Sequence, residues 1–378
     1  MKKNSVPFYR QIKEDILKKI EEGEYKVGDK IPSIFELSKI YNVSSIVVRQ
    51  ALGELIKKGY LEGVPGKGTF VKEKKEEEIK RDEKLIGLIF TEMVGNPFFA
   101  EIFTGIENIL SIYGYHMIIS ISYNMIDREK KFLKEYMEKG VKGIIITPTE
   151  VNRTTFDNEI FFEFQRQNIP VVFVDRKIEG IDFDYISSDN FEGGYNATKY
   201  LISLGHRRIG IILGINANTV RDRLEGYKKA LKEHNIDFDP ILVKRSFAEL
   251  QYEESGYTNT MDLLHLKEPP TAIFACNEAI AIGIYKACFE LGLNIPDNLS
   301  VIGYDNLSFT ASLNPPLTTI NQKKREMGEE AAKMLLSRIN GDKREPQKII
   351  FKTELIERNS CKKLDKINEG VKINKERR

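Results

Sequence analysis

The sequence predicts an α/β protein in which a small domain of helices and one hairpin precedes a larger domain of parallel sheets covered by helices. Three observations support this prediction. Residues 1–72 carry apolar side chains at helical spacing and end in a glycine-rich turn between short extended segments. Residues 73–84 are almost all charged and cannot bury a core, so they predict a solvated linker without a DNA-binding role. From Leu85 onward, short apolar runs alternate with amphipathic segments.

Length and composition place the chain among globular proteins of two or three domains. Its 378 residues exceed what one ordinary core accommodates. The three cysteines, Cys276, Cys288 and Cys361, show neither metal-ligand spacing nor a pairing pattern, which favours a reducing compartment and predicts no metal site or cofactor. No apolar run approaches the ~18 residues that cross a bilayer, and the N-terminus shows no secretion signal. We therefore expect a cytoplasmic protein without a membrane partner.

Residues 1–72 predict three helices followed by a small hairpin. Ser33 and Ser44 are candidate N-caps for the second and third helices. A tight turn over 63–68 precedes a short strand at 69–71. This order is that of a winged helix-turn-helix. The apolar residues of the first helix and the glycines that end it are Ile12, Ile16, Leu17 and Ile20, then Gly23 and Gly28.

Four stretches of this domain together resemble the GntR-type regulators. They are Pro7-Phe8-Tyr9-x-Gln11-Ile12, Gly28-x-x-Ile31-Pro32-Ser33, Val43-Ser44-x-x-x-Val48-Arg49-x-Ala51-Leu52 and Gly66-x-Gly68-Thr69-Phe70-Val71. The resemblance implies that the helix beginning at Ser44 lies in the major groove of DNA. It also implies that the wing tip at 66–68 approaches the minor groove or its phosphates.

The candidate DNA contacts lie at the predicted helix starts and in the wing. The fork of Arg49 suits a guanine or a phosphate, although an ion pair on the domain surface is the alternative. Lys67, between two glycines, suits a phosphate. With 14 Lys and Arg against 9 Asp and Glu, residues 1–72 also attract the DNA backbone. The predicted DNA-binding residues are Ser33, Ser44, Ser45, Val47, Arg49, Gly66 and Lys67.

The chain departs from the GntR pattern at several of these positions. Ile34-Phe35 stands where the family usually has Glu-Arg, Ser45 where it has Arg, and Val47 where it often has Thr. Basic and polar contacts to DNA are therefore fewer, and the resemblance does not give the operator sequence.

The larger domain predicts a parallel sheet with its ligand at the carboxyl ends of the strands. The predicted strands are 85–90, 116–121, 143–147, 171–174, 209–213, 272–275 and 300–304, and the predicted helices include 97–113, 128–139 and 193–204. Acids, amides and arginines follow several of these strands. Together with aromatic faces, such groups suit a polyhydroxylated ligand, because each hydroxyl both donates and accepts.

From Leu85 to Arg358 the chain resembles the LacI/GalR-type repressor core, which is similar to periplasmic sugar-binding proteins. The stretches that carry the resemblance are Ile86-Gly87-x-Ile89, Asn96-Pro97-Phe98-Phe99, Gly143-Ile144-Ile145-Ile146, Val174-Asp175-Arg176, Asp189-Asn190-x-x-Gly193-Gly194, Leu204-Gly205-His206-Arg207-Arg208-Ile209-Gly210, Arg223-x-x-Gly226-Tyr227, Ile302-Gly303-Tyr304-Asp305 and Pro315-Pro316-Leu317-Thr318-Thr319-Ile320. The resemblance implies two Rossmann-like lobes, joined by three crossings, that close on a sugar, and a homodimer.

The resemblance also implies which residues contact the effector. The predicted effector-binding residues are Phe98, Thr147, Asp175, Arg176, Thr219, Arg223, Asn277 and Asp305. Glu278 replaces the Asp that usually follows Asn277. His206, alone between a helix and a strand, is predicted to be structural. The predicted domains are 1–72, the linker 73–84, a two-lobed periplasmic-binding-protein-like core over 85–360, and a flexible basic tail over 361–378.

A GntR-type DNA-binding domain joined to a LacI-type core is similar to the L-arabinose-responsive repressors of Gram-positive bacteria. The resemblance implies a dimer that binds a pseudo-palindromic double-stranded DNA operator and is released by L-arabinose, with xylose, galactose or ribose as alternative effectors. Two other classes of protein predict features of their own. A plain sugar-binding protein predicts a secretion signal. A glycoside-cleaving enzyme predicts paired carboxylates, for which only Asp175 and Asp305 are candidates. We therefore expect a non-enzymatic repressor.

Overall fold

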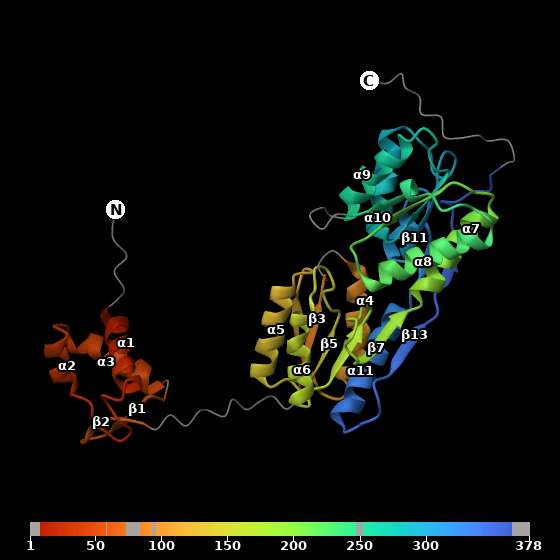
Figure 1. Cartoon of the computed structure of the whole chain (residues 1–378). Coiled ribbons are helices and arrows are strands. Elements are labelled where there is room, and N and C mark those ends of the chain that lie inside the picture. The colour runs from red at the N-terminus through yellow and green to blue at the C-terminus, as the bar shows by residue number, and fades with distance from the viewer. Residues whose placement is uncertain (1–7, 58, 73–83, 93–95, 247–251, 365–378) are drawn as a thin grey trace. The chain divides into compact units, whose positions relative to one another are not determined.

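The computed structural model describes residues 8–57, 59–72, 84–92, 96–246 and 252–364, and the chain forms two compact units that meet between Arg81 and Asp82 (Figure 1). The predicted linker, except for Lys84, and the predicted tail beyond Leu364 lie outside the described residues. Each unit is considered by itself.

The first unit has the predicted three helices and hairpin. The helices are α1 (Phe8–Glu21), α2 (Ile34–Ile40) and α3 (Ser45–Lys57), and β1 (Leu61–Val64) pairs antiparallel with β2 (Gly68–Val71). Ser33 is the N-cap of α2, as predicted. Its side chain accepts a hydrogen bond from the Glu36 backbone N–H, and the Glu36 carboxylate accepts one from the Ser33 N–H. Apolar side chains from all three helices form one small core.

The second unit consists of two lobes, each built on a six-stranded sheet with helices on both faces (Figure 1). The N-lobe sheet has the order β13-β7-β6-β5-β3-β4, and all its pairings are parallel. Its elements are β3 (Leu85–Phe90), α4 (Pro97–Leu110), β4 (His116–Ile121), α5 (Ile126–Lys139), β5 (Gly143–Ile146), η1 (Thr155–Asn158), α6 (Glu159–Arg166), β6 (Val171–Val174), β7 (Asp184–Ser188), α11 (Lys324–Ile339) and β13 (Lys348–Phe351). Helices α4 and α11 cover one face, and α5 and α6 the other.

The C-lobe sheet has the order β14-β12-β11-β10-β8-β9 and is parallel except for β14. Its elements are α7 (Asn190–Ser203), β8 (Ile209–Leu213), α8 (Asn218–Glu233), η2 (Pro240–Leu242), β9 (Val243–Arg245), α9 (Tyr252–Leu264), β10 (Ala272–Ala275), α10 (Glu278–Glu290), β11 (Ser300–Asp305), η3 (Ser308–Ser312), β12 (Thr318–Asn321) and β14 (Glu354–Ile356). The chain passes between the lobes three times, after β7, β12 and β13.

All seven predicted strands are present, with one end shifted by a residue in two of them. The strands that the sequence did not predict are polar or lie at sheet edges, among them β7, β9 and β14. Helix α4 ends at Leu110 rather than at 113. Residues after 360 continue to pack on the C-lobe, since the Leu364 N–H donates to the Leu204 carbonyl at 2.8 Å. Within the described part of the chain, every helix is too short or too polar to traverse a bilayer.

Candidate DNA and effector sites

Helix α3 carries two opposite stripes of side chains. Val48, Ala51, Leu52 and Leu55 are spaced i, i+3, i+4, i+7 and are buried in the core of the first unit. The exposed stripe on the other side has the same spacing and consists of Ile46, Arg49, Gln50 and Gly53. Among the described residues, Arg49 makes no ion pair or hydrogen bond. The alternative interpretation, an ion pair on the domain surface, therefore finds no acidic partner for Arg49 among the described residues.

The remaining predicted DNA contacts of the helices occupy different environments. Ser45 is exposed in the first turn of α3. Ser44 is exposed too, and its carbonyl accepts from the Val47 and Val48 backbone N–H groups, which starts the helix. Val47 is half-buried against the core, so part of its side chain serves packing. The Ser33 hydroxyl is already engaged in the cap of α2.

The wing tip carries two lysines rather than one. Gly66 and Gly68 adopt positive φ angles of 74° and 122°, which place Lys67 on an exposed turn. The backbone of Lys30 forms an isolated antiparallel β-bridge with Phe70 of β2. Its side chain passes close to Gly68, since a Cβ at Gly68 would lie 2.5 Å from Cε of Lys30. The ammonium-bearing chain of Lys30 therefore lies across the wing. The sequence prediction missed Lys30, because only the folded hairpin brings it there.

In the second unit, a close contact between α7 and α8 positions the central arginine. A Cβ at Gly194 would lie 2.3 Å from the Arg223 carbonyl oxygen, and one at Gly226 would lie 2.1 Å from the Phe191 carbonyl oxygen. Because neither position tolerates a side chain, the two helix backbones touch. Asn190, in the first turn of α7, is thereby brought beside Arg223.

Arg223 is buried and held by several contacts. Its Nε donates to Oδ1 of Asn190 at 2.9 Å, and one terminal nitrogen donates to the Cys276 carbonyl. The other terminal nitrogen lies 3.9 Å from Oδ1 of Asp305. The guanidinium carbon lies 3.7 Å from the ring centre of Tyr304. The stacked ring and these acceptors hold the fork in one orientation.

Asp305 ends β11 and faces Arg223 from the same lobe. Its Oδ1 accepts from the Gln322 amide at 2.6 Å, and its carbonyl accepts from the Lys324 ammonium at 2.6 Å. Burial raises the pKa of Asp305 to about 6, against the lowering effect of the two cations. Its φ of 116° is a rare conformation for a residue other than glycine.

Asp175 directly follows β6 in the N-lobe and also has a positive φ, of 66°. Tyr185 and Ser187 donate to its carbonyl at 3.0 and 2.9 Å. Burial raises the pKa of its carboxyl group, and the charges of Arg176 and Arg223 oppose that shift. Since Arg223 belongs to the C-lobe, this electrostatic effect acts across the two lobes.

Two predicted effector contacts of the N-lobe have a buried polar atom without a hydrogen-bond partner among the described residues. Nη1 of Arg176 donates to Oδ1 of Asn124 at 2.7 Å, while its Nε lies 3.6 Å from Oδ2 of Asp175, beyond hydrogen-bond distance. The hydroxyl of Thr147, which follows β5, is likewise without one. Buried groups of this kind are normally satisfied, so these atoms suit hydrogen bonds to a ligand.

The other three predicted effector residues contribute less directly. Phe98 packs edge-on against Phe99, with ring centres 5.1 Å apart, in the N-lobe core. Thr219 is buried in the first turn of α8. Oδ1 of Asn277 caps α10 by accepting from the Ile280 N–H at 2.9 Å, which leaves its NH₂ group for a ligand.

Glu278, beside Asn277, has a structural position. Its carboxylate accepts from the Leu307 N–H at 2.6 Å and from the Thr319 hydroxyl at 2.7 Å, which ties α10 to the segments that follow β11 and begin β12. Burial, together with the charge of Asp305, raises the pKa of Glu278 to about 8. His206 is fully buried, and its Nδ1 lies 2.9 Å from the Thr271 hydroxyl. Burial lowers the pKa of His206 to about 4.

A carboxylate of the N-lobe caps a helix of the C-lobe. Both oxygens of Glu150 lie 2.9 Å from the backbone nitrogen of Asn218, the first residue of α8, and Arg221 pairs with Glu150 at 3.0 Å. The N-cap residue of α8 is Ala217, which has no capping side chain. We call this arrangement the cross-lobe contact. The sequence prediction missed Glu150, because its partner is distant in sequence and on the other lobe.

The loop that carries Glu150 is itself tied down. Arg153 pairs with the fully buried carboxylate of Glu129, which also accepts from the Thr149 N–H at 2.6 Å. Glu150 is therefore presented to α8 by a fixed turn rather than by a free loop.

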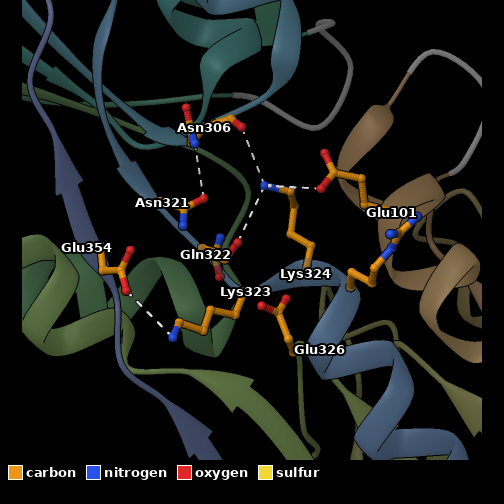
Figure 2. Close-up of a pocket in the computed structure, with 9 residues that line it drawn as sticks. Glu101, Asn306, Asn321, Gln322, Lys323, Lys324, Glu326 and Glu354 are labelled. Carbon is orange, nitrogen blue, oxygen red and sulfur yellow. Dashed lines mark hydrogen bonds and ion pairs between the residues drawn. The ribbon is translucent and has the colours of Figure 1, made fainter.

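A polar hollow of about 340 Å³ lies where β12 passes into α11 (Figure 2). Its lysines are already paired, Lys324 with Glu101 at 3.6 Å and Lys323 with Glu354 at 3.6 Å. The Lys324 ammonium points to the Asn306 and Gln322 carbonyls, as Figure 2 shows. Both lysines of the hollow are thus paired with carboxylates of the protein.

Comparison with known proteins agrees with both halves of the chain. Residues 8–71 match the bacterial regulatory proteins of the gntR family, and residues 198–361 match the periplasmic binding protein-like domain. An arabinose metabolism transcriptional repressor of Geobacillus stearothermophilus is 32% identical over 96% of this chain and 100% of its own length. The PurR repressor of Pasteurella multocida is 36% identical over 74% of this chain and 81% of its own.

Solved structures match the second unit. A LacI family regulator of Enterococcus faecium with bound ribose is 33% identical, with a TM-score of 0.65, over 75% of this chain and 100% of its own. The CcpA regulator of Lactococcus lactis is 27% identical, with a TM-score of 0.66, over 74% of this chain and 99% of its own. These relatives are transcriptional regulators and not enzymes.

Proposed function

We propose that this chain is a repressor controlled by a sugar. The chain belongs to the bacterial transcriptional repressors that join a GntR-type DNA-binding domain to a periplasmic-binding-protein-like core. In this proposal, a homodimer binds a pseudo-palindromic operator in the cytoplasm through two copies of α3. A monosaccharide bound between the lobes releases it.

The observation that supports a neutral sugar best is the charge balance around Arg223. The predicted effector residues include two buried cations, Arg176 and Arg223, and two buried carboxylates, Asp175 and Asp305. A phosphorylated ligand needs an excess of cations. A neutral polyhydroxylated ring needs both acceptors and donors. The Thr147 hydroxyl and Nε of Arg176, which have no hydrogen-bond partner among the described residues, add one donor each.

L-Arabinose is the effector that we propose first. The support is the relative of equal length, whose name refers to arabinose metabolism. Ribose is the strongest alternative, since a related core structure contains it, and xylose and galactose follow. The three pentoses differ in the orientation of their hydroxyl groups, and galactose carries one more CH₂OH group. A few side chains can distinguish such differences.

The cross-lobe contact supports the mechanism. A sugar can shift the balance between an open and a closed arrangement of the lobes only by binding one of them better. Hydrogen bonds to Asp175 and Thr147 on one lobe and to Arg223 and Asp305 on the other favour the closed arrangement. Glu150 at the start of α8 stabilises the same arrangement without touching the ligand.

Two measurements on the full chain test the proposal. Thermal unfolding with a panel of monosaccharides should show a rise in melting temperature with one pentose, because a ligand of the native state stabilises it. Fluorescence anisotropy on a DNA duplex selected by the protein should then show weaker binding when that sugar is present. The proposal is contradicted if none of the sugars raises the melting temperature, or if a sugar binds without changing the affinity for DNA.

A further inference from the structure

The exposed stripe of α3 contains a large apolar residue. Ile46, in the first turn, is 75% exposed, and it shares the stripe with Arg49 and Gln50. An exposed isoleucine in a polar stripe contributes nothing to the core of the unit. In helix-turn-helix proteins, the N-terminal residues of this helix contact the edges of bases.

Gly53 completes the stripe and has no packing reason to be glycine. A Cβ built there would find no atom within 4 Å, so any side chain fits. Glycine inside a helix costs about 1 kcal/mol relative to alanine. This contrasts with Gly194 and Gly226, where neighbouring backbone excludes a side chain. A glycine that the fold does not require, on an exposed face, suits the close approach of a ligand.

The chemistry of the stripe selects one feature of DNA. In the major groove, the only apolar group that a base presents is the C5 methyl group of thymine, and apolar side chains contact it. Arg49 beside Ile46 supplies a donor fork, and the amide of Gln50 suits adenine. The excess of basic residues in 1–72 complements the charge of the DNA backbone around such a contact.

We propose that Ile46 recognises a thymine methyl group in the operator, and that Gly53 lets α3 lie close enough to the bases for this contact. This inference rests on the proposed function, since it requires that α3 binds DNA. It assigns to this chain an apolar contact at the helix start, where Ser45 supplies neither the charge nor the length of the arginine usual in its family.

The test uses the full-length protein and duplexes selected by it from a random pool. In the selected duplex, each thymine is replaced in turn by uracil, which lacks only the C5 methyl group. At one position of each half-site, wild-type binding should weaken about fourfold, the fold-change given by burial of one methyl group. The Ile46→Ser variant should bind the thymine duplex more weakly and should not distinguish thymine from uracil there.

Ile40→Ser is the matched control, because Ile40 is 62% exposed but ends α2 outside the stripe. It should keep the wild-type preference for thymine. Equal affinity of the wild type for every uracil duplex, or a selected duplex without thymine in its half-sites, overturns the inference while leaving DNA binding intact. If the wild type selects no duplex, the proposed function itself fails.

A second variant distinguishes an effect on DNA binding from an effect on stability. Gly53→Gln adds a good helix former in open space, so the melting temperature should rise or stay unchanged. Its affinity for the selected duplex should fall tenfold or more, because the new side chain holds α3 away from the bases. Unchanged DNA affinity of Gly53→Gln overturns the proposed close approach of α3 to the bases.

Discussion

The two units present their functional side chains in opposite ways. In the DNA-binding unit, Ile46, Arg49 and Lys67 are exposed. In the effector unit, Asp175, Arg223 and Asp305 are buried, and Arg223 and Asp305 already hold protein partners. The exposed groups stabilise nothing in the isolated unit, whereas the buried groups are part of its packing.

This difference determines how each site responds to substitution. A side chain of the DNA-binding surface can be removed with a loss of affinity and no loss of stability. A buried charged group cannot, because its removal leaves partner charges uncompensated in a low dielectric. Burial also raises the pKa values of Asp305 and Glu278 into the range near neutrality, so the stability of the effector unit should change with pH there.

Arg223→Ala should have the largest effect. It leaves Asp305 buried with one fewer cation and removes the stack on Tyr304. We expect a loss of about 3–5 kcal/mol in the unfolding free energy of the effector unit and no response to sugar, while the DNA-binding unit still binds its operator. Lys229→Ala, on the exposed side of the same helix, is the control for denaturant unfolding. A normal response of Arg223→Ala to sugar would show that the effector site lies elsewhere.

The second prediction concerns pH. The pKa of Glu278 is about 8 in the folded chain and that of Asp305 about 6, both above their ordinary values of 4.5 and 3.8. A carboxyl group with a raised folded-state pKa contributes stability that is present below its unfolded-state pKa and is lost as pH rises through the folded value. The unfolding free energy should thus fall from pH 5 to pH 8, at about 1.4 kcal/mol for each pKa unit.

Glu278→Gln tests the origin of this pH dependence. The amide keeps the size of the side chain and does not titrate, so the fall in stability between pH 6 and pH 8 should flatten. Denaturant unfolding at several pH values measures it. A variant that keeps the full slope would assign the pH dependence to other groups.

Arg49→Ala tests the exposed side of the comparison. The melting temperature should stay unchanged, because Arg49 makes no ion pair or hydrogen bond among the described residues. Operator affinity should fall by about 1–3 kcal/mol if its fork binds a guanine, and sugar binding should be unaffected. A lowered melting temperature would show that Arg49 supports the fold after all.

Glu150→Gln should have a smaller effect, confined to the cross-lobe contact. The amide keeps one acceptor for the Asn218 N–H but loses the charge that attracts the helix terminus and Arg221. Sugar affinity should fall by about 1 kcal/mol, roughly fivefold, as expected for one charged hydrogen bond. Isothermal titration measures this loss. An unchanged affinity would mean that the cross-lobe contact does not depend on the closed arrangement.

Lys67→Ala should have the smallest effect. The wing also carries Lys30, so one ammonium remains when Lys67 is removed. Operator binding should weaken similarly for all duplexes, and the salt dependence should lose about 0.9 from its logarithmic slope. A change in sequence preference instead would show that Lys67 contacts a base.

The sequence predicted the structural features that depend on the local pattern of apolar and polar residues. Strands such as β3 and β10 were found at their observed ends because continuous apolar runs mark strands buried on both faces. Asp175 and Asp305 were predicted because polar residues at strand ends converge in parallel sheets, and the charge of Arg223 acts on both carboxylates. The ring of Phe98 packs in the N-lobe core. That these three residues contact the effector stays a prediction.

The features that the sequence did not predict depend on contacts between elements that are distant along the chain. Glu150 acts through α8 of the other lobe, and Asn190 meets Arg223 only because two helix backbones touch. Lys30 reaches the wing only through the folded hairpin. Edge strands such as β13 were missed because this strand has only four residues and pairs with β7, which is distant in sequence.

The most direct test of this account measures operator affinity of the full-length chain at one fixed salt concentration, with and without saturating L-arabinose. The account predicts salt-sensitive binding of a two-half-site duplex that weakens at least tenfold when the sugar is added, and that stays tight in Arg223→Ala under the same conditions. Equal affinity with and without every monosaccharide of the panel would contradict it.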